Sequence, residues 1–174
     1  MRHSEREEAE FREFVAGRLD RLRNFAFLVC GDWHRAEDAV QVTLSKLYVV
    51  WPKTAKGSAD AYSRRILINA VKDEWRRAWF RRERSTLVPP DAATADPAVL
   101  GAERIAVLSA LAKLPTKQRA VVVLRFWEDR SVEQTAEIMR CSTGTVKSHT
   151  ARGLQALRGL LEEKRSQQTE GVRR

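Results

Sequence analysis

Apolar side chains recur every three to four residues along almost the whole chain, which is the spacing of one face of a helix. No stretch of useful length alternates between apolar and polar residues as a strand would. A run of strand-favouring residues, 121–124, is flanked by helix formers and by no turn signal, so we interpret it as a buried helix segment. The pattern predicts an all-α fold.

Three helices are predicted in the first half of the chain. The first covers about residues 4–29 and stops at Gly31, which suits the left-handed conformation that follows a helix end. Asp32 can cap the second helix, which Pro52 ends, and Ser58 can cap the third. The inward-facing positions are Val40, Leu44, Leu47 and Trp51 on the second helix, and Tyr62, Ile66, Ala70 and Val71 on the third.

The second half begins after a change of composition. Residues 85–97 hold three of the five prolines without a periodic apolar pattern, which predicts a flexible linker between two small helical cores. Four shorter helices follow, at about residues 99–114, 116–127, 132–139 and 143–161, and the polar tail from residue 162 is expected to fray. The predicted organisation is a first domain at 1–84, a linker at 85–98, a second domain at 99–165 and a tail at 166–174.

Positive charge exceeds negative charge, with 32 lysines and arginines against 23 aspartates and glutamates and a formal net charge of +9. Such a balance favours a polyanionic partner, of which nucleic acid is the first candidate. The alternative is a protein whose positive charge serves only its solubility. The charge is densest in residues 76–84, which hold five arginines and one acid, so this helix end either follows phosphates or is simply solvated.

No metal or cofactor site is predicted. His3, His34 and His149 are scattered without partners, and Cys30 and Cys141 lie far apart without the spacing of a zinc site. The N-terminus lacks the apolar stretch of a signal peptide, and the longest apolar run, 25–30, is too short to cross a membrane. We expect free thiols and a cytoplasmic protein without membrane insertion.

Residues 132–152 have the features of a helix-turn-helix. Ser131 and Gln134 form a capping-box pattern that starts a helix, while Ala136 and Val146 can fill one small core between this helix and the next. The alternative is a plain helical hairpin. The exposed positions of the second helix combine hydrogen-bonding groups with positive charge, as reading the major groove requires: Thr145, Lys147, Ser148, Ala151 and Arg152.

These segments resemble sigma-70 family factors of the extracytoplasmic function class. LPTKQRAVVVLR at 114–125, SVEQTA at 131–136 and GTVKS at 144–148 resemble region 4 of that family. AEDAVQVTL at 36–44 and AYSRRILIN at 61–69 resemble region 2, so that the resemblance covers about residues 8–160. The segments RRILIN and FWEDRS are similar to those of the actinobacterial SigE-like family.

The resemblance implies a polymerase-binding surface on the second helix. Asp38, Gln41 and Leu44 would contact the clamp helices of the largest polymerase subunit, with Glu37 nearby. The flap of the second-largest subunit would be a further contact, and the linker would thread the active-site channel. The alternative is that Glu37 and Asp38 are ordinary solvated residues without a role in polymerase binding. They are not a catalytic pair, because adjacent helical positions diverge by about 100°.

The resemblance also implies a minus-10 site. Asn69 and residues 70–75 match the loop and helix start where the family holds a flipped-out base, with Lys72, Arg76 and Arg77 as further DNA contacts. Trp75 and Trp79 would serve either base stacking or the core, and we favour the core for at least one of them.

For the minus-35 element, Lys147 would meet the DNA backbone, Ser148 and Arg152 would reach bases, and Thr145 and His149 would lie in the same surface. Two departures from the family pattern affect this prediction. Arg140 stands where the turn usually has glycine, which predicts a left-handed residue at a cost of about 1 kcal/mol. His149 and Ala151 replace the more usual arginine and large side chain, which leaves the preferred minus-35 sequence open.

The prediction is therefore a non-enzymatic alternative sigma factor. It would bind core RNA polymerase and promoter DNA, with an anti-sigma protein as a possible further partner. The rival class is a stand-alone helix-turn-helix regulator that binds DNA without polymerase. Such a regulator would need neither the Asn69 motif nor the surface around Asp38 and Gln41. A hydrolase or nuclease would need convergent carboxylates or a metal site, which this pattern does not offer.

Overall fold

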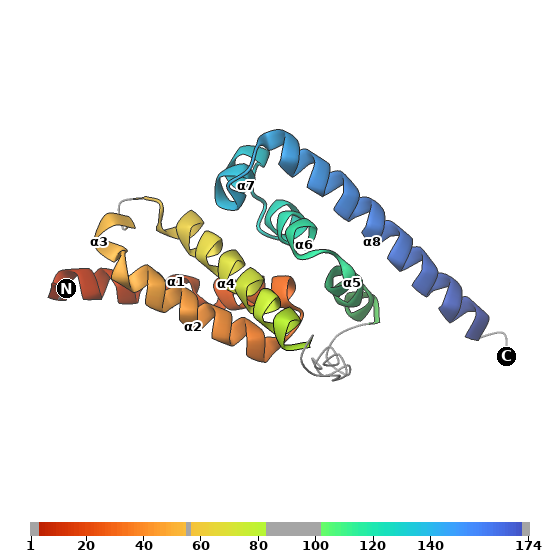
Figure 1. Cartoon of the computed structure of the whole chain (residues 1–174), viewed down its shortest axis with the longest axis horizontal. Helices are drawn as coiled ribbons and strands as arrows, with labels where there is room; N and C mark the ends of the chain where they lie inside the picture. The colour runs from red at the N-terminus through yellow and green to blue at the C-terminus, as the bar shows by residue number, and fades with distance from the viewer. Residues whose placement is uncertain (1–3, 55–56, 83–101, 172–174) are drawn as a thin grey trace.

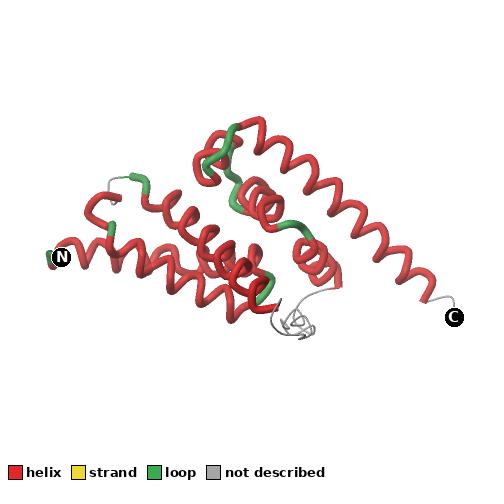
Figure 2. The backbone as a smooth tube through the Cα atoms, viewed as in Figure 1, coloured by secondary structure: helices red, strands yellow, loops and turns green. Residues whose placement is uncertain are grey.

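A computed structural model describes residues 4–54, 57–82 and 102–171, with the side chains of 74–82, 102 and 167–171 outside that description. Within these residues all regular structure is helical and no strand occurs, as the sequence pattern predicts (Figure 2). The predicted linker at 85–98 lies outside the described residues. None of the described helices is long and apolar enough to cross a membrane.

Four helices form the first half of the molecule. They are α1 at Glu5–Cys30, α2 at Trp33–Val49, α3 at Trp51–Thr54 and α4 at Ala59–Arg82. Gly31 ends α1 in the left-handed conformation with φ 79°, and the Asp32 side chain accepts a hydrogen bond from the Arg35 backbone at 2.8 Å, as predicted. Pro52 lies inside the short α3 rather than ending the second helix, because the early positions of a helix tolerate proline.

The second half consists of α5 at Ala102–Lys113, α6 at Thr116–Val122, a π-helical turn η1 at Val123–Trp127, α7 at Val132–Met139 and α8 at Thr143–Gly171. Residues 121–124 are helical and buried, which confirms the reading of that run. The helix expected at 116–127 is present, with a change to π-helical winding after Val122 that the sequence did not predict. One prediction was wrong, because α8 continues through most of the tail that we expected to fray.

The two halves lie side by side (Figure 1). Helix α4 packs against α1 and α2 on one side and against α7 on the other, while the C-terminal part of α1 packs against α5, α6 and η1. Helix α8 runs along the outside of α5, α6 and α7. The helix with the implied minus-10 residues therefore lies next to the first helix of the helix-turn-helix.

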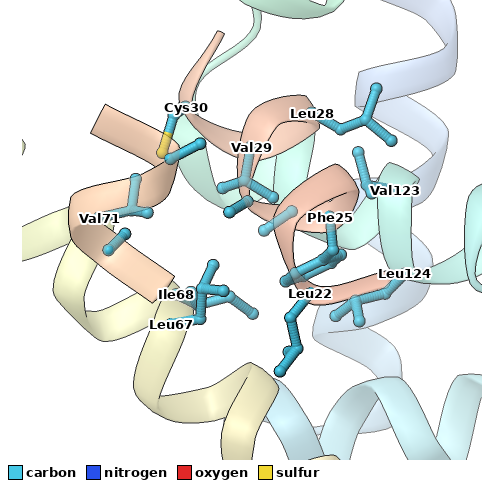
Figure 3. Packing of buried hydrophobic residues seen from close by; sticks show 14 of the residues in the cluster. Leu22, Phe25, Leu28, Val29, Cys30, Leu67, Ile68, Val71, Val123 and Leu124 are labelled. Atoms are coloured by element: carbon cyan, nitrogen blue, oxygen red, sulfur yellow. The ribbon is translucent and has the colours of Figure 1, made fainter. Parts of the chain in front are cut away.

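One hydrophobic core joins the halves, where the sequence led us to expect two cores. Figure 3 shows Leu22, Phe25 and Val29 of α1 packed together with side chains of α4 and of η1. The sequence pattern identifies the apolar face of each helix but not the helix that covers it. The fully buried members of this shared core include Leu22, Phe25 and Val29 from α1, Leu67 and Val71 from α4, and Leu124 from η1.

Candidate functional site

The helix-turn-helix has the geometry that its sequence predicts. Ser131 and Gln134 form a reciprocal capping box at the start of α7, with distances of 2.9 and 3.0 Å. Arg140 ends α7 in the left-handed conformation, with φ 51° and ψ 54°. Ala136 of α7 and Val146 of α8 are buried in one small cluster with Val121 of α6. Helices α7 and α8 therefore cross closely, which a plain helical hairpin would not require.

The implied minus-35 residues divide into two groups on α8. Lys147, Ser148 and Arg152 are exposed. Ser148 and Arg152 lie one helical turn apart on the same face, and Lys147 lies about 100° around the helix from Ser148. Thr145 is half-buried, and its hydroxyl lies 2.9 Å from that of Ser142, the residue whose hydroxyl also accepts the Thr145 backbone N–H. Thr145 therefore serves the start of α8 itself.

His149 is less exposed than these three residues. It is half-buried, and its Nδ1 atom is buried without a hydrogen-bond partner among the described residues. Lys147, Ser148 and Arg152 are thus the accessible members of the predicted minus-35 set, and His149 is not.

Helix α4 carries the implied minus-10 residues. Asn69 is exposed, but it lies in the middle of a continuous helix rather than at the loop and helix start that the resemblance implied. Lys72 is half-buried, and its pKa lies below the ordinary value, because burial disfavours the ammonium group and Lys117 of α6 repels it. The backbone of Trp75, Arg76 and Arg77 continues α4, and these side chains, like that of Trp79, lie outside the described residues.

The implied polymerase surface lies on α2. Asp38 and Gln41 are exposed and one helical turn apart, so they share a face. Leu44 is half-buried against the shared core, and Glu37 forms an ion pair with Arg23 of α1. Glu37 and Arg23 also line a hollow of about 500 Å³ beside the ring of Trp33, which stacks on Phe27 with centroids 4.2 Å apart. Asp38 and Gln41 are thus the most accessible members of this surface.

Sequence reasoning missed a network of ion pairs at the N-terminal end of α4. The side chain of Arg64 is only 1% exposed, and it pairs with Asp60 of its own helix and with Glu128, which is 7% exposed and follows η1. Arg130 also pairs with Asp60. The signal was available, because Arg64 falls one turn from Leu67 on the inward face of α4.

Arg119 makes a second buried polar connection. Its guanidinium group donates to the backbone oxygens of Ala112 and Leu114 in its own half and to that of Val29 in α1, the last at 2.9 Å. Burial lowers the pKa of Arg119 to about 10, so the group is still protonated at neutral pH. Arg119 therefore supplies a hydrogen-bond donor from the other half of the molecule to the C-terminal end of α1.

Among the described residues, no group of three or more histidine, cysteine, aspartate or glutamate side chains could hold a metal ion.

Two family models match the chain in the order in which these surfaces occur. The Sigma-70 region 2 model matches residues 14–81, and the Sigma-70, region 4 model matches residues 104–157. The first match includes the implied polymerase and minus-10 surfaces, and the second contains the helix-turn-helix.

Proteins named as sigma factors match this chain over most of their length. The RNA polymerase sigma-E factor of Streptomyces avermitilis is 42% identical over 156 residues, which cover 89% of this chain and 87% of that protein. The ECF RNA polymerase sigma factor SigL of Mycobacterium tuberculosis is 32% identical over 148 residues, which cover 82% of this chain and 83% of that protein.

Solved structures show a similar arrangement of helices. The sigma factor RpoE in complex with the anti-sigma factor NepR from Bartonella quintana matches with a TM-score of 0.77 and 29% identity, over 87% of this chain and 96% of that chain. CnrH in complex with the cytosolic domain of CnrY matches with a TM-score of 0.66 and 23% identity, over 88% of each chain, and supports the fold alone.

Proposed function

The chain belongs to the sigma-70 family of RNA polymerase sigma factors, in its extracytoplasmic function class, and from this we propose how its surfaces divide the work of transcription initiation. As a sigma factor it binds core RNA polymerase and directs initiation at specific promoters. The alternative of a stand-alone regulator does not account for the region 2 match at residues 14–81. The first domain at 1–84 would bind polymerase and the minus-10 element, and the second at 99–165 the minus-35 element.

The polymerase contact is proposed for the exposed face of α2. Asp38 and Gln41 would meet the clamp helices of the largest subunit, and Leu44 would support them from the edge of the core. Glu37 is already paired with Arg23, so it would hold the surface in shape rather than supply a free charge. The flap of the second-largest subunit would bind the second domain.

The two DNA contacts are proposed for α4 and α8. Asn69 offers an exposed amide that can hydrogen-bond a base of the opened minus-10 strand, with Lys72, Trp75, Arg76 and Arg77 following along the same helix. On α8, Lys147 would meet a phosphate, while Ser148 and Arg152 would reach base edges in the major groove. The observation that carries the proposal is this exposed triplet on the second helix of a complete helix-turn-helix, on a chain that also has region 2.

The protein itself would perform no catalysis, because the chemistry of RNA synthesis belongs to the polymerase. Its place of action would be the cytoplasm, where polymerase transcribes. An anti-sigma protein is proposed as a further partner, since the similar sigma factor RpoE forms such a complex. RpoE and this chain share one fold over most of their length, which supports a common kind of partner.

Run-off transcription tests the proposal. Core polymerase from an actinobacterium, with and without the protein, is given promoter fragments selected from a random library. Asp38→Ala should weaken polymerase binding, and Asn69→Ala should weaken initiation most on promoters with an intact minus-10 element. Arg152→Ala should lower initiation by about tenfold or more at an intact minus-35 element and hardly at all where the contacted base is already replaced.

Arg158→Ala is the matched control for Arg152→Ala, because it removes an exposed arginine from the same helix outside the proposed reader. Specific initiation that depends on the protein, with these separate effects, supports the proposal. Binding to duplex DNA without any association with polymerase would contradict it.

A further inference from the structure

A hollow of about 500 Å³ opens between the second half of α1 and the first turns of α2. Two carboxylates, one guanidinium group, one amide and one indole ring line it, from Asp20, Arg23, Asn24, Glu37 and Trp33. Its volume lies within the range of about 300–1,000 Å³ that is typical of ligand pockets. We name this hollow the Trp33 pocket.

Negative charge is in excess among the residues that line the Trp33 pocket. Glu37 is paired with Arg23, so these two charges offset each other. Asp20 is exposed and forms no ion pair among the described residues, which leaves one carboxylate over. The whole protein carries a formal net charge of +9, so this local excess is opposite to the overall balance. A phosphate would be repelled here, and the ligand that fits is a cation.

The indole ring of Trp33 supplies the apolar wall of the pocket. Phe27 stacks on one face of this ring, with centroids 4.2 Å apart and an interplanar angle of 12°. The stack fixes the orientation of the ring and leaves its other face for a ligand. A planar guanidinium group can lie on an aromatic face while it donates paired hydrogen bonds to a carboxylate. An arginine side chain therefore suits the pocket better than a lysine side chain.

The pocket is continuous with the surface that we propose for core polymerase. Glu37 belongs to both, Asp38 follows it directly, and Gln41 lies one helical turn further along α2. The other wall is α1, which packs along α2. A protein that covers Asp38 and Gln41 therefore also reaches the edge of the pocket.

We propose that the Trp33 pocket receives an arginine side chain of core RNA polymerase, which stacks on Trp33 and pairs with Asp20. This inference rests on the proposed function, because it assigns the pocket to the same partner as the exposed face of α2. Tryptophan and arginine are enriched among the residues that contribute most to protein interfaces, especially where they fill pockets. The pocket thus adds affinity and selectivity to the contact that Asp38 and Gln41 make.

A series of variants at Trp33 tests the stacking in the full-length protein. Trp33→Leu keeps an apolar cover over Phe27 but removes the aromatic face, and we expect the Kd for core polymerase to rise about twofold to thirtyfold. Trp33→Phe keeps an aromatic face, so its Kd should lie between those of Trp33→Leu and the wild-type protein. Thermal unfolding of both variants tests a purely structural role, in which the Kd would follow the Tm instead of the aromatic face.

Variants at Asp20 test the charge. Asp20→Asn removes the carboxylate and Asp20→Lys reverses its sign, so the Kd for core polymerase should rise several-fold at each step. Both effects should shrink as the salt concentration rises above about 0.1 M. Glu103→Gln and Glu103→Lys make the same changes of net charge at an exposed position on α5. These two controls should leave the Kd within about twofold of wild type.

Photochemical cross-linking identifies the occupant. The photoreactive residue p-benzoylphenylalanine replaces Asn24 at the exposed edge of the pocket, and mass spectrometry identifies the peptide that it captures in the complex with core polymerase. We expect a polymerase peptide that contains an arginine. Replacing that arginine with methionine and combining the change with Trp33→Leu should raise the Kd by less than the product of the two single effects.

The outcomes separate the pocket from the proposed function. If Trp33→Leu and Asp20→Lys bind core polymerase as tightly as the wild-type protein while Asp38→Ala binds more weakly, the pocket is not part of the interface. Capture of a segment without arginine, or additive losses in the double-mutant cycle, would also overturn the proposed occupant. If the wild-type protein does not associate with core polymerase at all, the proposed function itself fails.

Discussion

Asp60 lies in the first turn of α4 among the guanidinium groups of Arg18, Arg64 and Arg130. Burial alone would raise its pKa, but Arg64 and Arg130 outweigh burial and hold the pKa below the ordinary value of 3.8. A carboxylate with a lowered folded-state pKa stabilises the fold above the unfolded-state pKa. That contribution is lost as the pH falls through the folded-state pKa.

We therefore predict that the free energy of unfolding decreases below about pH 4 and that Asp60→Asn removes part of this decrease. Urea unfolding of both proteins between about pH 6 and about pH 3 measures the effect. Asp20→Asn, at an exposed position on α1, is the matched control. Parallel stability curves for Asp60→Asn and the wild-type protein over this range would show that the network does not depend on the Asp60 charge.

Arg119 carries a second residue-scale prediction. Arg119 is 2% exposed, and its guanidinium group donates hydrogen bonds to three backbone oxygens. Arg119→Met would therefore leave these buried acceptors without donors. Each buried group left unsatisfied costs about 1–3 kcal/mol, and we expect a total loss of at least about 3 kcal/mol in a urea titration. Arg104→Met, at an exposed position of α5, should stay within about 0.5 kcal/mol of wild type. A similarly small loss for Arg119→Met would mean that water replaces the arginine.

At the scale of single elements, α6 and α8 cross where Gly153 faces Val122. A Cβ atom at Gly153 would lie 2.7 Å from Val122 Cγ2, whereas one at Gly159, further along α8, would meet nothing within 4 Å. We predict that Gly153→Ala lowers the free energy of unfolding by about 1–3 kcal/mol through overpacking. Gly159→Ala should raise it by up to about 1 kcal/mol, because alanine is the better helix former.

Thermal unfolding measures this pair, since about 1 kcal/mol moves the Tm of a chain of this size by about 2–4 °C. Val122→Ala in the Gly153→Ala background should recover part of the loss by making room for the methyl group. If both glycine substitutions change the Tm in the same direction, the crossing is looser than the structure shows.

The elements were predictable where the signal is local. The left-handed Arg140, the capping box of Ser131 and the glycine stop at Gly31 each depend on residues within one turn, and the sequence places all three correctly. The π-helical winding of η1 and the extension of α8 were missed. The polar composition of the tail hides the extension of α8.

At the scale of the whole molecule, local patterns were insufficient. Leu67 and Leu124 each lie on an apolar helix face, but no periodicity indicates that the faces meet in one core. Arg64 falls on the inward face of α4, but its partner Glu128 is distant in the sequence, so no local pattern indicates their ion pair. The candidate site divides in the same way. The helix-turn-helix is encoded within a short segment, whereas the contact between the halves exists only in three dimensions.

A shared core predicts shared unfolding. Leu22 of α1 and Leu124 of η1 are fully buried in one cluster, so each half loses part of its core when the other unfolds. Hydrogen exchange along a urea series, read separately in peptides of α1 and α6, should give coincident midpoints for the wild-type protein. Leu124→Ala, a core truncation that costs about 2–5 kcal/mol, should lower both midpoints together.

Leu22→Ala is the reciprocal variant, and it should also lower both midpoints, although it lies in the other half of the chain. Independent halves would behave differently: each truncation would lower only the midpoint of its own peptides. In that case the contact between the halves would contribute little to the stability of either half. Coincident shifts would instead mean that the two halves unfold as one cooperative unit through their shared core.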